Sequence, residues 1–203
     1  PMAQARLAQT ATEAAQAAQA LGFPVALKAL SPELTHKSDA GLVQLNLSTV
    51  EEVRAAADAL ALRKTGQSLT GLLVQAMVLG GIETIVGITT DPQFGPVIAF
   101  GLGGTLVELL DDVVLRLPPL TMWQAREMLR EASVWRLLQG FREHLPADVA
   151  SLTRLLVNTS RLAEEQAGHV ISLDLNPVIV LPDGDGVAVV DFRVFVQEGG
   201  VMS

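Results

Sequence analysis

A chain of 203 residues, 49% hydrophobic and 18% charged, can bury the core of a compact unit of one or two lobes and is not a disordered tail. Its formal net charge of -8 argues against a nucleic-acid or anionic-membrane surface, since both need a basic patch, so any anionic ligand must be met by a few local cations. The sequence has no cysteine, which excludes a disulfide framework, a thiol nucleophile and cysteine-ligated zinc, fits a reducing compartment and leads us to expect a cytoplasmic protein.

Residues 1–70 are predicted to form a small first lobe made of a helix, two strands and a second helix. Thr10 begins a capping box, TATE, before AAQAAQAL, and Gly22 ends this helix. The strand candidates PVALKAL and LVQLNL follow, and Ser48 begins a second capping box, STVE, before VRAAADALALRK. The polar stretch KTGQSLTG indicates a hinge to the next lobe.

Residues 71–203 are predicted to form a larger second lobe, with the strand candidates LLVQAMV, ETIVGITT, PVIAF and VVLRL. Thr121 opens a helix that runs toward Gly140, and ADVASLTRLLVNTSRLAEEQ forms another that ends near Gly168. The strand VISLDL and a closing hairpin come last, with VIVL and VAVVDFRV on either side of PDGDG. This order is neither an all-β repeat nor a regular βαβ alternation, so we predict a mixed, partly antiparallel α+β fold in the broad α/β sense.

Phosphate binding is one interpretation of the loop that follows the second predicted element. Lys28 lies in the otherwise apolar PVALKAL, and a lysine there must reach solvent or meet an anion. The loop THKSDAG comes just after it, and a glycine-containing loop can fold its N–H groups over a polyphosphate beside the cations of Lys37 and His36. Taken alone, HKSD also suits a solvated turn.

Oxygen-bearing side chains near the C-terminus suggest a cation site. DLNP places Asp174 and Asn176 two positions apart, hence on one face of a strand. Asp191 lies within the apolar VAVVDFRV, where a buried carboxylate needs a cation or hydrogen-bond donors. Oxygen ligands on adjacent strands suit magnesium, with water and substrate phosphates at the remaining positions. The alternative is that the first two residues shape a turn before Pro177 and that Asp191 pairs with Arg193.

The middle of the chain contains a strand, the Gly80-Gly81 turn and a second strand. Such a segment can form a hinge whose backbone reads the edge of an adenine, with Met77 packed on the ring and Glu83 on the ribose. A methionine in a strand is more often part of the core.

Other familiar motifs are incomplete or absent. The stretch FGLGGTL follows a strand as a dinucleotide fingerprint does, but Leu106 stands where the third glycine is needed, which favours a tight glycine turn in a core. The sequence has no GxxxxGK phosphate loop, no GxSxG elbow and no HExxH, and its histidines are His36, His144 and His169.

Taken in order, PVALK, HKSDAGLV, VQAMVLGGIETIVGITTDPQFGPVIAFGLGGTLVELLDDVVLRLPPL, LDLNPVIV and VVDFRV closely resemble the ATP-grasp domain of NDP-forming acyl-CoA synthetases. This family includes ADP-forming acetyl-CoA synthetase and is related to the β subunit of succinyl-CoA synthetase. The resemblance runs from about Thr10 to Val196. It implies a two-lobed ATP-grasp fold and the reaction acyl-CoA + NDP + phosphate ⇌ acid + CoA + NTP, through an acyl phosphate and a phosphohistidine.

The resemblance also implies ATP or ADP and Mg²⁺ as cofactors, and a CoA-binding and ligase-CoA module as partner, on the same chain or another. In the family that module holds the histidine first phosphorylated, and we expect it to select the CoA and the carboxylic acid. We therefore expect this chain alone to be inactive overall. His36 is the implied relay that passes the phosphoryl group to the nucleotide, and Asp174 matches an acidic position of the metal and phosphoryl-transfer site. The other implied roles are the nucleotide-phosphate contact Lys28, the adenine hinge Gln75 to Met77, and the magnesium ligands Asn176 and Asp191.

The sequence departs from the family pattern at two places. Ser172 stands where many relatives carry a glutamate, which bears on metal affinity and catalysis. Relatives also have a strand and turn of the YGIPVP type before the first helix, so we expect the first lobe to be truncated at its start. A non-catalytic regulatory ATP-grasp-like module, as fused to protein-lysine acetyltransferases, is the alternative function. A nicotinamide-dependent dehydrogenase would rest on GLGGTL alone.

Overall fold

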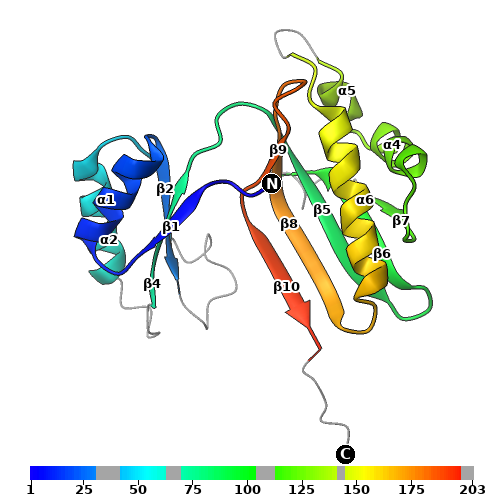
Figure 1. Cartoon of the computed structure of the whole chain (residues 1–203), viewed down its shortest axis with the longest axis horizontal. Helices are drawn as coiled ribbons and strands as arrows, with labels where there is room; N and C mark the ends of the chain where they lie inside the picture. Colours follow the sequence, from blue (N-terminus) through cyan, green and yellow to red (C-terminus); the bar gives the residue numbers. More distant parts are fainter. Residues whose placement is uncertain (31–41, 63–69, 104–112, 141–144, 198–203) are drawn as a thin grey trace, which may run out of the picture. The chain divides into compact units, whose positions relative to one another are not determined.

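The computed structural model describes residues 1–30, 42–62, 70–103, 113–140 and 145–197. The chain divides into two compact units, Ala3–Leu79 and a second one made of Pro1–Met2 with Gly80–Ser203 (Figure 1). Each unit combines an antiparallel sheet with helices, in agreement with the predicted α+β class. The first unit extends past the predicted boundary at residue 70, because the strand β4 (Gly71–Ala76) pairs with the strands of the first sheet. The predicted hinge KTGQSLTG falls almost wholly outside the described residues.

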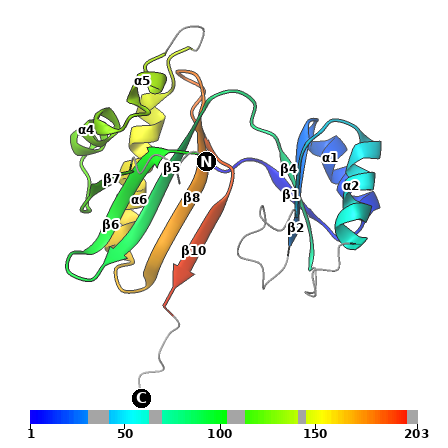
Figure 2. The same ribbon diagram turned by 180° about the vertical axis from the view of Figure 1, so that it is seen from behind.

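The first unit is a four-stranded sheet in the order β1-β4-β2-β3, with both helices on one face (Figures 1 and 2). Its other strands are β1 (Ala5–Ala8), β2 (Val25–Leu30) and β3 (Val43–Leu47), and its helices are α1 (Ala11–Leu21) and α2 (Val50–Leu62). Val25, Leu27 and Ala29 of β2 pack with small residues of the helices in one apolar cluster. The strand β1 lies where the sequence was expected to lack a strand. Alanine-rich segments favour helices in isolation, but here pairing with β4 stabilises the extended conformation.

The start of α2 differs from the predicted one by a single residue. The N–H of Glu52 donates to Oγ1 of Thr49 at 3.1 Å, and Oε2 of Glu52 accepts from the N–H of Ser48 at 2.7 Å. Thr49 rather than Ser48 therefore caps the helix, since α2 begins at Val50. The cap at Thr10 is confirmed, because its Oγ1 accepts from Glu13.

The second unit is a sheet in the order β10-β8-β5-β6-β7, with β9 also paired to β8. Its strands are β5 (Ile82–Asp91), β6 (Gly95–Leu102), β7 (Val113–Arg116), β8 (Val170–Val180), β9 (Val187–Val189) and β10 (Phe192–Val196). The helices α4 (Met122–Glu131), α5 (Trp135–Leu138) and α6 (Val149–Glu165) gather on one side of this sheet (Figures 1 and 2). Their apolar faces and the facing strand residues, among them Phe100 and Leu156, form the core.

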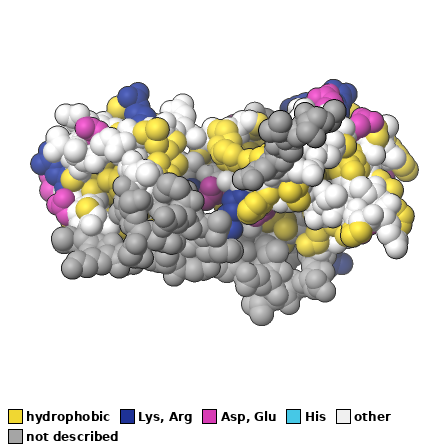
Figure 3. All heavy atoms as spheres, turned by 90° about the horizontal axis from the view of Figure 1, so that it is seen from below, with side chains coloured by type: hydrophobic (Ala, Val, Ile, Leu, Met, Phe, Trp, Pro, Cys, Tyr) yellow, Lys and Arg dark blue, Asp and Glu magenta, His cyan; other side chains and the backbone are white. Residues whose placement is uncertain are grey.

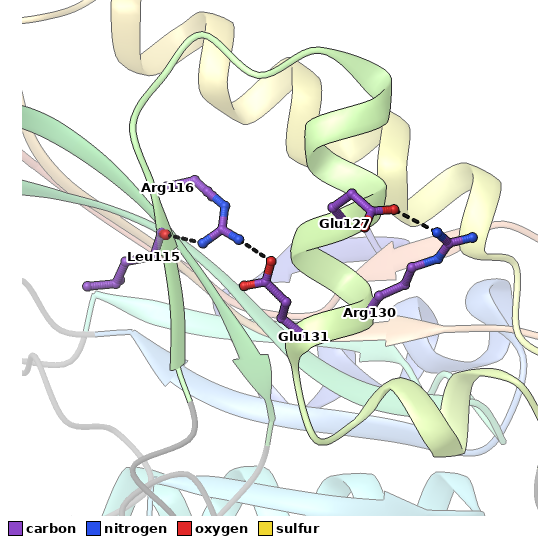
Figure 4. A network of polar contacts seen from close by, with 5 residues as sticks. All are labelled: Leu115, Arg116, Glu127, Arg130 and Glu131. Carbon is purple, nitrogen blue, oxygen red and sulfur yellow. Dashed lines mark hydrogen bonds and ion pairs between the residues drawn. The ribbon is translucent and has the colours of Figure 1, made fainter.

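Polar contacts fasten the helices of the second unit. Arg116 of β7 forms an ion pair with Glu131 at the end of α4, and Glu127 pairs with Arg130 at 2.6 Å within the helix (Figure 4). Thr121 caps α4, as predicted, and forms a complete capping box with Gln124. The predicted helix from Thr121 toward Gly140 is nevertheless interrupted, because Ala132 adopts an extended backbone and separates α4 from α5. No described helix has the length and apolarity that crossing a membrane requires.

The end of the chain also differs from its predicted division into strands. VISLDL and VIVL form one strand, β8, which continues through Asn176 and Pro177. VAVVDFRV is instead divided at Val190 and Asp191 into β9 and β10, and both of these strands pair with β8.

Candidate functional site

The strand β8 carries a bulge at Asn176 and Pro177, where the neighbouring strand β5 offers only Ile85 opposite them. Regular pairing resumes on either side, at Thr84 with Val178 and at Val86 with Leu175. Pro177 has no N–H to give to a ladder, so this is a place where proline is tolerated in a sheet. Bulges of this kind redirect side chains and often occur beside active sites.

On its other side the bulge meets the gap between β9 and β10. The N–H of Asn176 donates to the carbonyl oxygen of Asp191 at 3.1 Å, and the N–H of Val190 donates to the carbonyl oxygen of Pro177 at 3.0 Å. Both Asn176 and Asp191 are partly buried. The structure therefore brings together the two residues predicted as magnesium ligands.

Asp174, the third candidate near the bulge, is electrostatically coupled to Asp191. Desolvation by the surrounding sheet raises the pKa of the Asp174 carboxyl, the nearby Arg193 guanidinium opposes this, and the Asp191 carboxylate raises the pKa further; the net direction is upward. Arg193 lies directly opposite Asp174 in the ladder between β10 and β8. The Asp191 carboxylate is thus near enough to disfavour the charged form of Asp174, which a bound cation would relieve.

The Asp174 side chain lies on the sheet face that the helices leave open. Leu173 and Leu175, its neighbours along β8, pack into the helix-covered core, so Asp174 points the other way. Opposite it on β5 is Gly87, where an added Cβ would lie 3.2 Å from the Leu173 carbonyl oxygen and 3.7 Å from Cβ of Ala99. No large side chain covers the sheet beside Asp174 at these two positions, because they are occupied by Gly87 and Ala99. Ser172, where the resemblance leads us to expect a glutamate in many relatives, is partly buried on β8 opposite Phe195.

The donor set at the bulge suits a hard cation. Asp191 and Asp174 offer carboxylate oxygens and Asn176 an amide oxygen, and magnesium prefers such oxygens. Within the part of the chain that the structure describes, no group of three or more histidine, cysteine, aspartate or glutamate side chains forms a metal site. A magnesium ion held here would accordingly keep positions for water or phosphate oxygens, as it commonly does.

The first unit places two further candidates on one sheet face. Lys28 is 6% exposed and Gln75 is 3% exposed, on the neighbouring strands β2 and β4. Because Leu27 and Ala29 face the helices, Lys28 lies on the opposite face, and Gln75 shares that face because it lies opposite Ala26. Lys28 is thus buried in an inner strand rather than extended into water.

The predicted adenine hinge, Gln75 to Met77, lies in the first unit, and the predicted ribose contact Glu83 lies in the second. Met77 follows β4, is partly buried, and donates its N–H to the Pro24 carbonyl oxygen at 3.0 Å; it is not part of the first unit's buried cluster of described residues. Glu83 is exposed near the start of β5 in the second unit. The predicted relay His36 and the predicted phosphate contact Lys37 lie outside the described residues.

One contact beside the bulge was missed from the sequence. Thr84 of β5 is fully buried, and its Oγ1 donates to the carbonyl oxygen of Val178 at 3.0 Å. The only sequence signal was a lone hydroxyl within the apolar run IETIVGI, which is weak because threonine is common in strands.

Two surface hollows of the second unit contain no predicted site residue. A hollow of about 520 Å³ lies between the helices and includes Trp123, Arg126 and Thr153. Another of about 310 Å³ lies beside β7 and includes Phe94 and Leu115. Hydrophobic side chains reach the surface of both units between charged ones (Figure 3), so an apolar hollow is no pointer to chemistry here. The oxygen-rich bulge is the better candidate site.

Comparison with known proteins assigns the family. A family model described as an ATP-grasp domain matches residues 1–196, and the chain belongs to this family. The predicted ATP-grasp fold is therefore confirmed. The β subunit of ADP-forming acetate–CoA ligase II from Pyrococcus furiosus is 38% identical over 201 residues, which cover 97% of this chain and 85% of the relative.

Two further proteins extend the comparison. The ADP-forming acetate–CoA ligase I of Archaeoglobus fulgidus is 43% identical over 195 residues, which are 95% of this chain but 28% of the relative. A structure of the dinucleotide-forming acetyl-coenzyme A synthetase 1 of Ca. Korarchaeum cryptofilum, in complex with coenzyme A and Mg-AMPPCP, superposes with a TM-score of 0.83 at 39% identity, covering 97% of this chain and 85% of that one. In that structure a phosphohistidine segment points toward the nucleotide-binding site.

Proposed function

We propose that this chain is the nucleotide-binding ATP-grasp part of an NDP-forming acid–CoA ligase. Its reaction would be the transfer of a phosphoryl group between a phosphohistidine and ADP or ATP, within acyl-CoA + NDP + phosphate ⇌ acid + CoA + NTP. The observation that carries the proposal is the hydrogen-bonded meeting of Asn176 and Asp191 at the β8 bulge, with Asp174 coupled to it. Relatives named as ADP-forming ligases support the same function.

The side chains of the second unit would hold a magnesium–nucleotide complex. Asp191 and Asn176 would bind the ion, with Asp174 beside them at the place of phosphoryl transfer. The ion, when bound, neutralises charge on phosphate oxygens, which is most of what phosphoryl transfer needs. Glu83 would accept a ribose hydroxyl.

We also expect nucleotide-binding residues in the first unit. Lys28, buried in an inner strand, would bind phosphate oxygens, and the segment from Gln75 to Met77 would read the adenine edge. His36 is proposed as the relay and Lys37 as a second phosphate contact from the family resemblance alone. A neutral imidazole is a competent phosphoryl acceptor near pH 7.

The remaining steps would belong to a CoA-binding and ligase-CoA partner module, on the same polypeptide or on another. Support comes from the relatives, of which one is a β subunit and another is a longer enzyme of which this chain matches 28%. That module would bind CoA and the carboxylic acid, so this chain alone would bind nucleotide without turning over. The relatives' names do not favour a regulatory acetyltransferase module, and the family match leaves GLGGTL no support as a dehydrogenase motif.

Calorimetric titration of ADP and ATP, with and without magnesium, tests the proposal. We expect magnesium-dependent binding that Asp191→Ala abolishes and His36→Ala largely spares. Asp58→Ala, which removes an exposed carboxylate from α2, is the matched control and should bind as the unmodified chain does. An absence of binding at every magnesium concentration would contradict the proposal.

A further inference from the structure

Thr84 makes a side-chain contact across the sheet directly beside the β8 bulge. Its Oγ1 donates to the carbonyl oxygen of Val178 at 3.0 Å, and the residue is 0% exposed. Val178 is the first residue after the bulge, next to Pro177 and two positions from Asn176. A buried hydroxyl is costly without a partner, so this bond fixes where β5 meets β8.

Gly103 holds Thr84 from the other side. Gly103 follows β6, and its N–H donates to the Glu83 carbonyl oxygen at 2.9 Å. A Cβ at Gly103 would lie 2.8 Å from the backbone N of Thr84 and 2.9 Å from the carbonyl carbon of Glu83. The glycine backbone therefore rests directly on the peptide that precedes Thr84. This close approach, rather than a dinucleotide, explains why the chain needs a glycine there.

The bulge makes this contact consequential for the ligand pair. Between β5 and β8 the ladder is interrupted where Ile85 faces Asn176 and Pro177, and Pro177 cannot donate. Where pairing is interrupted, a slip of one residue would turn Asn176 to the other face of the sheet. The Thr84 hydroxyl forms a hydrogen bond that is not part of the backbone ladder. This bond joins β5 to the Val178 carbonyl oxygen, just beyond the bulge.

We propose that Thr84, seated by Gly103, is a positioning residue for the Asn176 and Asp191 pair. The inference rests on the proposed function, because it assigns Thr84 a role toward the magnesium–nucleotide complex that this pair would hold. Thr84 would not touch the ion. It would hold β8 so that the Asn176 oxygen faces the Asp191 carboxylate.

The chain offers a matched control for this contact. Thr90, at the far end of the same two strands, donates its Oγ1 to the carbonyl oxygen of Ile171 at 2.7 Å. It makes the same kind of bond from β5 to β8, far from the bulge. Thr90 is exposed whereas Thr84 is buried, so Thr90→Val removes a hydroxyl with the same kind of bond from a more solvated position. It should lack the proposed positioning effect, and Thr84→Ser restores a hydroxyl at the buried test position itself.

The experiment measures the magnesium concentration at which ADP binding is half-maximal, together with ADP affinity without magnesium and the melting temperature. For Thr84→Val we expect the required magnesium to rise about tenfold, the lower end of what loss of an outer-shell partner costs in metal affinity. ADP affinity without magnesium should not change. Thr84→Ser and Thr90→Val should both need the same magnesium as the unmodified chain. If Thr84→Val does not fold, Thr84→Ala replaces it with the same expectation.

Each other outcome overturns the inference. An unchanged magnesium requirement in Thr84→Val, an equal rise in Thr90→Val, or a failure of Thr84→Ser to restore binding would each show that Thr84 has no special positioning role. The unmodified chain separates this failure from that of the proposed function. If it binds ADP with magnesium, only the positioning role is lost; if it does not, the proposed function and the inference fall together.

Discussion

The backbone N–H of Asn176 lies 3.1 Å from the carbonyl oxygen of Asp191, in a hydrogen bond that joins the β8 bulge to the gap between β9 and β10. Two irregularities in neighbouring strands thus coincide at the two residues that carry oxygen ligands. A regular ladder would continue past both positions and would not gather them at one break. The bulge and the gap are coupled, because backbone N–H and carbonyl groups at each form hydrogen bonds with groups at the other.

Replacement of Asp174 should raise the melting temperature at pH 7 and weaken magnesium-dependent ADP binding. The folded state favours the protonated carboxyl, because its pKa is raised above the ordinary value of 3.8. The stabilising contribution is therefore present below that value and is lost as the pH rises through the raised pKa. Asp174→Asn should melt at a higher temperature than the unmodified chain at pH 7, and the two should converge below pH 3.8. Magnesium-dependent ADP binding should weaken at least about tenfold.

Thermal unfolding across pH and calorimetry check this prediction. Asp58→Asn on α2 removes an equal charge and should leave both quantities nearly unchanged. A lower melting temperature for Asp174→Asn at pH 7 would show that Asp174 stabilises the fold instead.

Lys28→Met should weaken nucleotide binding and leave the fold intact. The side chain is buried in an inner strand, so methionine can occupy the space of its carbon stem while the charge is lost. Loss of a charged hydrogen bond to phosphate costs roughly 1.5–3 kcal/mol, or about 10- to 150-fold in affinity. Titration with ADP and circular dichroism measure the two effects. Arg6→Met, which removes an exposed cation from the same sheet, should bind normally, and equal losses in both variants would refute a specific phosphate contact.

Asp148 should be the most consequential helix cap of the second unit. Burial raises the pKa of its carboxyl. Hydrogen bonds from Ser151 and from the Gly186 N–H, together with the nearby Arg154 charge, lower this pKa by more, so the net direction is downward. Its stabilising contribution is present above the ordinary value of 3.8 and is lost as the pH falls through the lowered pKa. Asp148→Ala should cost about 1–2 kcal/mol near pH 7, because α6 loses its cap.

Urea unfolding at several pH values measures this cost. Asp148→Asn keeps an oxygen acceptor and should lose clearly less stability than the alanine variant. A cost that stays constant down to the most acid pH would contradict the ionised-cap explanation.

Gly103→Ala should destabilise the second unit by about 1–3 kcal/mol, the usual cost of forcing an extra carbon into a packed site. The added carbon would lie 2.8 Å from the Thr84 backbone N, and backbone can yield only by moving β5 away from β6. Denaturant unfolding measures the cost. A stability equal to that of the unmodified chain would mean that the two strands separate freely.

The sequence was informative where a charged residue interrupts an apolar run. Lys28 and Asp191 could be selected on that basis, and Asp174 by its spacing from Asn176; burial of Lys28 agrees with its selection. The caps at Thr10 and Thr121 were equally readable, whereas at Ser48 two hydroxyls precede two glutamates and local pattern cannot choose between them.

Long-range pairing could not be predicted from the sequence. Pro177 suggested the end of a strand, because proline weakens a ladder, yet pairing with two neighbouring strands carries β8 through it. The division of VAVVDFRV follows from the same bulge. Thr84 gave no usable signal, since its role depends on Val178, 94 positions away in the chain.

The separation between those two residues has a consequence for how the site assembles during folding. Asn176 lies on β8 and Asp191 in the gap between β9 and β10, within one hairpin region, so their hydrogen bond closes a short loop at little cost in chain entropy. The Thr84 bond joins distant segments and must await docking of β5. We therefore expect the ligand pair to meet early and to acquire its final geometry late, so a mutation at Thr84 would slow the last step of folding more than the first.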